Sequence, residues 1–277
     1  MRPSIKGREV CMLLKILPVM IVLVSLVCTP ARAASSASLV NLGRWSFTNL
    51  DRLIVKSRNV VGSGERLVIL SRPFLGTPYM AHSLVGGPET DERLVLDLAG
   101  LDCFTFLDLL EALRRCDAAA DLLDQLRQVR YRQGRVSYEN RRHFFSDWIA
   151  DDDPVAVDVT SEVGRNRHRT VVKNLNRKAD GSQWLEGLPV VQRAIRYLPT
   201  GALDATVLAS LRPGDFIGIY SEKDGLDVSH VGLLVPAAGG SWALRHASSR
   251  PGVMQVTDDE LTAYLRGKPG IVIYRAR

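Results

Sequence analysis

The stretch DFIGIYSEKDGLDVSHVGLLVPAAGGSWALRHA, residues 215–247, decides the fold class. It alternates short runs of isoleucine, valine and leucine with turns rich in glycine, aspartate and proline, a pattern typical of antiparallel strands. The pattern continues to the C-terminus, where one short helix interrupts it. We therefore expect strands at Asp215–Tyr220, His230–Val235, Trp242–Ala247, Gly252–Val256 and Gly270–Tyr274, and a helix at Asp258–Leu265.

The residues that precede this half show helical spacing instead, with apolar residues recurring every three or four positions. The expected helices are Leu39–Arg58, Gly64–Arg72, Asp102–Arg115, Ala118–Arg132 and Glu139–Ala150. Asp102 is a suitable N-cap, and Gly134 predicts a helix stop. Between the halves, Val155–Thr160 alternates like a strand, and we expect Thr170–Val172 to pair with it. Helices followed by antiparallel strands predict an α+β fold, with N-terminal helices packed on a C-terminal antiparallel sheet.

The first 33 residues have the order of a secretory signal. Four basic residues precede an apolar run from Ile16 to Val27, and Ala31-Arg32-Ala33 follows as a small-residue cleavage site. The apolar run is shorter than the roughly 20 residues that span a bilayer, so an uncleaved membrane anchor is the less favoured alternative. We expect cleavage after Ala33, no membrane insertion afterwards, a periplasmic location, and one domain over residues 34–277.

Composition and charge point to a soluble globular protein. The chain is 46% hydrophobic and 24% charged, which excludes a disordered, collagen-like or multi-pass membrane protein. Its net charge is +6, but residues 1–33 hold five basic residues and one acid, so the remainder carries 31 basic and 29 acidic residues. This near balance argues against a nucleic-acid partner. Residues 161–180 keep six basic residues, which indicate either a solvated hairpin loop or a lip that attracts an anionic substrate.

Removal of the signal leaves two cysteines, Cys103 and Cys116, at opposite ends of one expected helix. A helix of that length spans about 20 Å, too far for a disulfide, so both thiols should be free. Cys103 begins the helix, where the helix dipole and unpaired N–H groups stabilise a thiolate nucleophile. The alternative is a small buried side chain, which is our interpretation of Cys116.

Two histidines on neighbouring expected strands offer the base that such a nucleophile needs. His230 opens one strand, and His246 lies on the next, so both imidazoles can share one face of the sheet. Each alone would be an ordinary sheet histidine. No C-x-x-C, H-E-x-x-H or phosphate-binding glycine motif occurs, so we expect no metal and no cofactor.

Five short segments in a fixed order carry a family resemblance: Phe74–Tyr79, Leu101–Phe106, Leu211–Asp215, Ser229–Gly232 and His246–Ser248. Their order resembles the NlpC-type bacterial cell-wall cysteine hydrolases, a branch of the papain-like fold. Within that group the chain looks most like the exported N-acetylmuramoyl-L-alanine amidase-like cysteine family. Residues 141–149, followed by Asp158–Thr160, are similar to that family's insertion, and the resemblance covers about Leu67 to Tyr274.

The resemblance implies roles for individual residues. Cys103 would be the nucleophile, His230 the general base and His246 the residue that orients it. Tyr79 would lie near the nucleophile. Further candidate substrate contacts are Asp102, Arg141, His143 and Trp148. In this interpretation arginine binds a peptide carboxylate and tryptophan stacks on a sugar, whereas an amphipathic helix facing the core is the alternative for residues 141–148.

The implied activity is hydrolysis of the amide between N-acetylmuramic acid, including its anhydro form, and L-alanine. NlpC-type endopeptidases usually have serine and glycine after the cysteine, and here Phe104 and Thr105 replace them. This departure favours the amidase over a stem-peptide endopeptidase of the same fold. Two further hypotheses are a non-catalytic wall-binding module and a membrane-surface or nucleic-acid binder that uses residues 161–180. We expect a monomer whose partners are peptidoglycan or muropeptide fragments.

Overall fold

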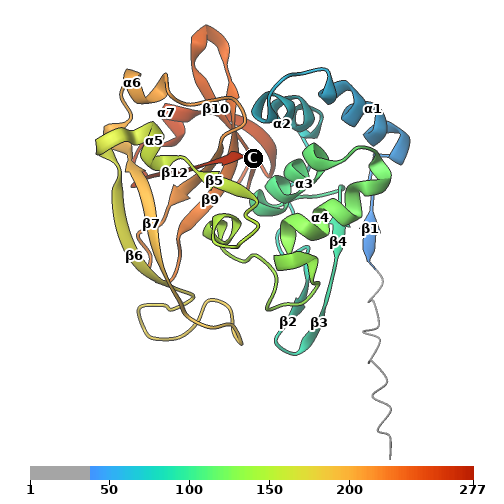
Figure 1. The fold of residues 1–277 in the computed structure, drawn as a ribbon, viewed down its shortest axis with the longest axis horizontal. Helices are drawn as coiled ribbons and strands as arrows, with labels where there is room; N and C mark the ends of the chain where they lie inside the picture. The colour runs from blue at the N-terminus through green and yellow to red at the C-terminus, as the bar shows by residue number, and fades with distance from the viewer. Residues whose placement is uncertain (1–37) are drawn as a thin grey trace, which may run out of the picture. The chain divides into compact units, whose positions relative to one another are not determined.

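A large antiparallel sheet forms the C-terminal half of the computed structural model, which describes residues 38–277; the predicted signal peptide lies outside them. Within this range the strand order is β11-β10-β9-β8-β12-β7-β6, and β5 adds to the end of β12. Helices α1 to α4 lie together on one side of this sheet (Figure 1). The expectation of helices with a large antiparallel sheet is confirmed. The strands are β5 (Ala156–Asp158), β6 (Arg169–Leu175), β7 (Val191–Pro199), β8 (Phe216–Tyr220), β9 (Val228–Pro236), β10 (Trp242–Ser248), β11 (Gln255–Glu260) and β12 (Gly270–Ala276).

The N-terminal half is mostly helical and also contains four short strands. Its helices are α1 (Phe47–Arg58), α2 (Ser63–Ser71), α3 (Cys103–Arg115) and α4 (Leu122–Arg130). Strands β1 (Leu39–Asn41) and β4 (Val95–Asp97) pair in parallel, and β2 (Val85–Gly87) pairs with β3 (Thr90–Arg93). The short helices α5 (Thr160–Gly164), α6 (Ala205–Leu208) and α7 (Leu261–Tyr264) accompany the sheet.

The centre of the sheet is buried on both faces, which explains the continuous apolar run of β8. Phe216 and Tyr220 belong to the core shared with α2 to α4, whereas Ile217 and Ile219 belong to a second core on the opposite face. Successive strand residues point to opposite faces, so FIGIY must be apolar throughout. Helix α3 supplies much of the first core, because its residues from Phe106 to Leu113 are almost completely buried. The helix start is thereby fixed against the sheet.

The expected helix at Glu139–Ala150 is wrong. Only a 3₁₀ turn at Phe145–Ile149 forms there; Glu139 and Asn140 lie in a turn, and Phe144 is extended. Long-range partners take the backbone groups that a helix would use: the Arg142 N–H donates to the Arg130 carbonyl at 2.8 Å, and the Ser146 N–H donates to Asp227 at 2.7 Å. The apolar spacing of this segment reflects burial against the sheet and not a helix period.

Several other boundaries differ from expectation. Leu39–Asn41 is a strand, and α1 begins only at Phe47, where the Ser46 side chain caps it. The expected pairing of Thr170–Val172 with Val155–Thr160 is wrong, because β6 pairs with β7, a strand that the sequence did not indicate, and β5 pairs with β12.

The segment after β10 also departs from expectation, and the difference matters for the site. Residues 258–260 continue strand β11, which pairs with β10, so the expected helix at Asp258–Leu265 shrinks to Leu261–Tyr264. The Glu260 carboxylate caps that short helix. Asp258 and Asp259 are therefore strand residues.

Candidate active site

Cys103 is the first residue of α3, and a capping box fixes it there. One carboxylate oxygen of Asp102 accepts hydrogen bonds from the Phe104 and Thr105 N–H groups at 2.9 and 2.7 Å. The Thr105 hydroxyl accepts in return from the Asp102 N–H at 2.9 Å. The predicted N-cap is confirmed. The Asp102 side chain therefore caps α3, which is a structural role; its expected role as a substrate contact stays a prediction.

The Cys103 thiol is neutral at rest. Burial, followed by the negative charge of Asp102, raises the pKa of Cys103 to about 12, although backbone N–H groups, among them that of Val231, lower it. The N–H groups at the helix start lower the pKa of Cys103, as expected, but desolvation and the capping carboxylate outweigh them. For this thiol to act as a nucleophile, a neighbouring base would have to take its proton.

Strands β9 and β10 bring the two predicted histidines into contact. Arg245 pairs with Leu233 across the strands, which places His246 and His230 diagonally on one face. His230 Nε2 and His246 Nδ1 are 2.7 Å apart, and the rings are perpendicular. Burial lowers the pKa of His230 to about 3 and also lowers that of His246. Both imidazoles are therefore neutral.

Asp259 on β11 extends this contact into a chain of hydrogen bonds. His246 Nε2 lies 2.8 Å from Asp259 Oδ2, and Arg250 binds both oxygens of the same carboxylate at 2.8 and 2.7 Å. A carboxylate only accepts, so His246 carries its proton on Nε2 and leaves Nδ1 bare. His230 must then donate from Nε2, which leaves its Nδ1 free as a base.

A cavity of about 310 Å³ joins Cys103 to His230. Its walls are largely apolar and include Phe104, Phe144, Trp184 and Leu185. Asp227 is the single acidic lining residue, and its two oxygens already accept from the Ser146 and Val228 N–H groups, each at 2.7 Å. The one carboxylate that lines the cavity is thus buried and bound to the backbone, and the cavity suits a neutral, partly apolar group.

The remaining predicted contacts divide into two groups. Tyr79 lies near Cys103, because it forms a β-bridge with Leu101, two residues before Cys103; burial raises the pKa of Tyr79. His143 lines the cavity, and its Nε2 lies 2.7 Å from the Tyr138 carbonyl. Arg141 and Trp148 do not line it. Arg141 is buried 3.4 Å from Glu92, and Trp148 is fully buried between Phe104, Phe145 and Phe216, so neither reaches a ligand there.

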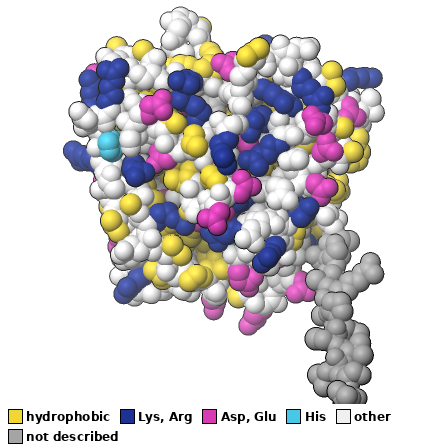
Figure 2. All heavy atoms as spheres, viewed as in Figure 1, with side chains coloured by type: hydrophobic (Ala, Val, Ile, Leu, Met, Phe, Trp, Pro, Cys, Tyr) yellow, Lys and Arg dark blue, Asp and Glu magenta, His cyan; other side chains and the backbone are white. Residues whose placement is uncertain are grey.

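The basic residues of 161–180 do not form a single positive surface. Arg167 pairs with Asp204 at 2.5 Å, and Lys173 is buried, donating to three backbone carbonyls. On the face shown in Figure 2, basic and acidic side chains are interspersed. That face lacks the continuous positive field that nucleic-acid binding requires.

The chain is similar in sequence to one protein family. A sequence model of the AmiA-like, N-acetylmuramoyl-L-alanine amidase-like family matches residues 69–271, which include Cys103, both histidines and Asp259. The chain belongs to this amidase-like family. Family membership implies a hydrolase with a peptidoglycan-type substrate. No curated protein matches the chain.

Solved structures resemble this amidase-like chain over most of its length. A Legionella pneumophila protein from a family of unknown function has a TM-score of 0.67 at 21% identity, covering 83% of this chain and 94% of its own. A Bacteroides uniformis N-acetylmuramoyl-L-alanine amidase has a TM-score of 0.65 at 25% identity, covering 78% and 100%. A Bacteroides fragilis protein described as a candidate xylanase scores 0.61 at 27% identity, covering 74% and 98%. Proteins that share this fold are thus described with different activities.

The amidase-like site contains residues that sequence reasoning missed. Asp259 and Arg250 complete the histidine chain, Tyr264 packs its ring 5.0 Å from that of His246, and Trp184 lines the cavity. A strand assignment for Asp258–Glu260 would have placed Asp259 on the His246 face. Across residues 38–277, no helix has the length and apolarity of a membrane span, and no cluster of three His, Cys, Asp or Glu is arranged to hold a metal ion.

Proposed function

We propose that this chain is an exported cysteine hydrolase, of the NlpC type within the papain-like group, that cleaves the amide between N-acetylmuramic acid and L-alanine. One observation carries the proposal: the hydrogen-bonded chain Asp259, His246, His230 ends at a cavity that also holds Cys103. This order of carboxylate, orienting residue, base and nucleophile is the arrangement that acyl transfer needs.

The first step is attack by sulfur with simultaneous proton transfer. Because both thiol and imidazole are neutral at rest, His230 Nδ1 takes the Cys103 proton as Sγ bonds to the lactyl carbonyl carbon. The His246 imidazole, whose Nε2–H is held by Asp259, accepts from His230 Nε2 and stabilises the imidazolium that forms. The proton then passes to the nitrogen of L-alanine, and the C–N bond breaks.

The second step regenerates the enzyme. The muramic acid remains bound through a thioester to Cys103, and the stem peptide leaves with L-alanine at its free N-terminus. His230, now neutral, takes a proton from water as the water oxygen attacks the thioester. The C–S bond breaks, the proton returns to sulfur, and the sugar leaves with a free lactyl carboxylate.

The apolar character of the cavity favours this bond over a peptide bond further along the stem. An endopeptidase that grips a free peptide N-terminus needs an acceptor for an ammonium group. The Asp102 carboxylate is engaged as the helix cap, and that of Asp227 is engaged by backbone N–H groups. A neutral sugar face fits the cavity better than an ammonium.

Mass spectrometry of products tests the assignment. Residues 34–277 are incubated with N-acetylmuramoyl-L-alanyl-D-isoglutamine, beside Cys103→Ala and Cys116→Ala proteins. We expect free L-alanyl-D-isoglutamine from the wild type and from Cys116→Ala, and none from Cys103→Ala. On longer muropeptides, sugar that retains a peptide stump would instead identify an endopeptidase, and binding without any turnover would identify a wall-binding module.

Export is the other part of the proposal, and it rests on the order of residues 1–33. Protein recovered from the periplasm of a Gram-negative host should begin at Ala34 in N-terminal sequencing. A chain that retains residue 1 and sediments with membranes would show an anchor in place of a cleaved signal.

A further inference from the structure

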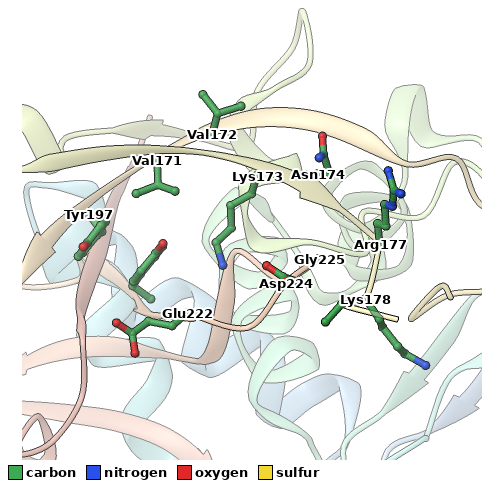
Figure 3. A pocket seen from close by; sticks show the side chains of 12 residues that line it. Val171, Val172, Lys173, Asn174, Arg177, Lys178, Tyr197, Glu222, Asp224 and Gly225 are labelled. Atoms are coloured by element: carbon green, nitrogen blue, oxygen red, sulfur yellow. The ribbon is translucent and has the colours of Figure 1, made fainter. Parts of the chain in front are cut away.

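We propose that a second cavity, of about 430 Å³, binds the charged end of the stem peptide, namely a residue that carries both an ammonium and a carboxylate group. The identity of this ligand rests on the function proposed above. The cavity lies between the edge strand β6 and the end of β8 with the turn at residues 221–225 that follows it. Figure 3 shows Lys173 reaching from β6 toward that turn, with Glu222 at one end of the cavity and Arg177 and Lys178 toward the other.

The charges around this cavity have both signs. Glu222 and Asp224 come from the turn, and Arg177 and Lys178 follow β6. The negative charges of Asp224 and Glu222 act on the Lys173 ammonium, and the Lys178 ammonium lies over the Trp184 ring. Between them lies a less polar floor that includes Val171 and the stacked rings of Tyr197 and Tyr220, 3.8 Å apart. A ligand with opposite charges on an aliphatic frame matches this surface.

Buried contacts hold the two walls of the charged cavity in place. The Lys173 ammonium donates to the carbonyls of Ser221, Lys223 and Leu226, so it is committed to the turn and is not a ligand group. The Asn176 N–H donates to the Gly225 carbonyl at 2.9 Å. Gly225 has φ of +77°, and a Cβ there would lie 2.5 Å from the Arg177 carbonyl oxygen. The cavity is preformed, which reduces the ordering cost of binding.

The charged cavity adjoins the cavity that Cys103 and His230 line, called the catalytic cavity below, across a shared wall. Gly225 lines the first and the next residue, Leu226, lines the second. Trp184, on the catalytic side, donates its indole N–H to the Asp224 carbonyl at 2.9 Å, and the Lys178 ammonium lies 5.1 Å from its ring centre. A peptide leaving the catalytic cavity past Trp184 therefore meets the charged cavity. The catalytic cavity lacks free charges, so this neighbour is where a charged end finds partners.

Two matched substrates test the inference. One is N-acetylmuramoyl-L-alanyl-D-isoglutaminyl-L-lysine with a free carboxylate, and the other replaces lysine with norleucine amide. We expect kcat/KM about 3- to 10-fold higher for the charged peptide, since each exposed charge contact contributes only a modest amount. The ratio should fall to about 1 in the double variant Glu222→Gln/Asp224→Asn and in Arg177→Gln/Lys178→Gln.

A control pair and a binding measurement separate the possible failures. Glu89 and Asp91 are exposed carboxylates with the same i, i+2 spacing that line neither cavity, so Glu89→Gln/Asp91→Asn should keep the wild-type ratio. If neither peptide is cleaved, the proposed function fails, and calorimetry with Cys103→Ala protein still tests the cavity. Equal affinity for the charged and neutral peptides there, or equal kcat/KM in the active enzyme, would overturn the proposal.

Discussion

The two cysteines of the described chain lie at the two ends of helix α3, and their thiols have a similar pKa. Burial raises the pKa of Cys103 and that of Cys116 to about 12. Their surroundings differ. Cys103 opens onto a cavity shared with His230, whereas Cys116 is fully buried and its thiol donates to the Ala112 carbonyl at 3.1 Å. Access and a neighbouring base, and not thiol acidity, distinguish a candidate nucleophile from a structural cysteine here.

Removing the base should have the largest effect, because it makes the N-terminal end of α3 resemble the C-terminal end. In His230→Gln, Cys103 keeps its cavity but loses its proton acceptor. We expect kcat/KM to fall about 10³-fold, within the range for general-base catalysis. His168→Gln, which changes a histidine outside the cavity, should leave kcat/KM unchanged. A loss below 10-fold in His230→Gln would mean that another group deprotonates Cys103.

The charge behind the histidines should matter less than the base itself. Asp259→Asn keeps an acceptor for His246 but removes the negative charge that stabilises the imidazolium pair. We expect a loss in kcat/KM of about 10- to 100-fold, the range for partners that orient a reacting group. KM should change little, because Asp259 does not line the cavity.

Asp258 provides the matched control for Asp259. It is the neighbouring carboxylate on β11, and it binds Arg245 at 2.8 and 2.7 Å on the other side of the strand. Asp258→Asn should lower thermal stability, because Arg245 is buried, while kcat/KM stays close to that of the wild type. Equal losses of activity in the two variants would show that Asp259 acts only by supporting the strand.

Local sequence was sufficient for the start of α3 and for the strands that bear the two histidines. The Asp102 cap depends on residues three positions apart, and the β8 to β10 runs are apolar in their own right. Asp259 was missed because the sequence predicts a helix from Asp258, whereas the cap is Glu260, whose carboxylate accepts from the Thr262 N–H. Pairing with β10 overrides that signal for the residues before it. The pairing of β11 with β10 cannot be inferred from the residues around Asp259 alone.

The misplacement of Trp148 has a similar origin. The run from His143 to Ile149 has apolar residues at helical spacing, yet its backbone binds to Asp227, far along the chain. Trp148 consequently points into the core, and the exposed tryptophan of the cavity is Trp184, in a connection between two strands that carries no periodic pattern. Side chains placed by such connections are the ones that sequence periodicity cannot locate.

Truncating the cysteine at the buried end of α3 should reduce stability and leave catalysis intact. Cys116→Ala removes a fully buried sulfur and leaves a small cavity, so we expect a loss of about 1–2 kcal/mol in the free energy of unfolding. Cys103→Ala, at the cavity, should lose less than about 0.5 kcal/mol. Urea denaturation of both proteins measures the difference. The reverse order of stability would mean that the cavity collapses onto Cys103 and that its thiol is part of the core.

The smallest expected effect concerns the acidity of the cavity thiol. Asp102→Asn keeps a good N-cap residue but removes the negative charge that, after burial, raises the pKa of Cys103. A lower pKa means more thiolate at a given pH, so alkylation by iodoacetamide at pH 8 should become about 2- to 3-fold faster, and its pH profile should shift toward lower pH. Cys116 should remain unmodified in both folded proteins, because it is buried. If the variant reacted no faster than the wild type, burial alone would hold the thiol neutral, and the cap would be only a structural feature of α3.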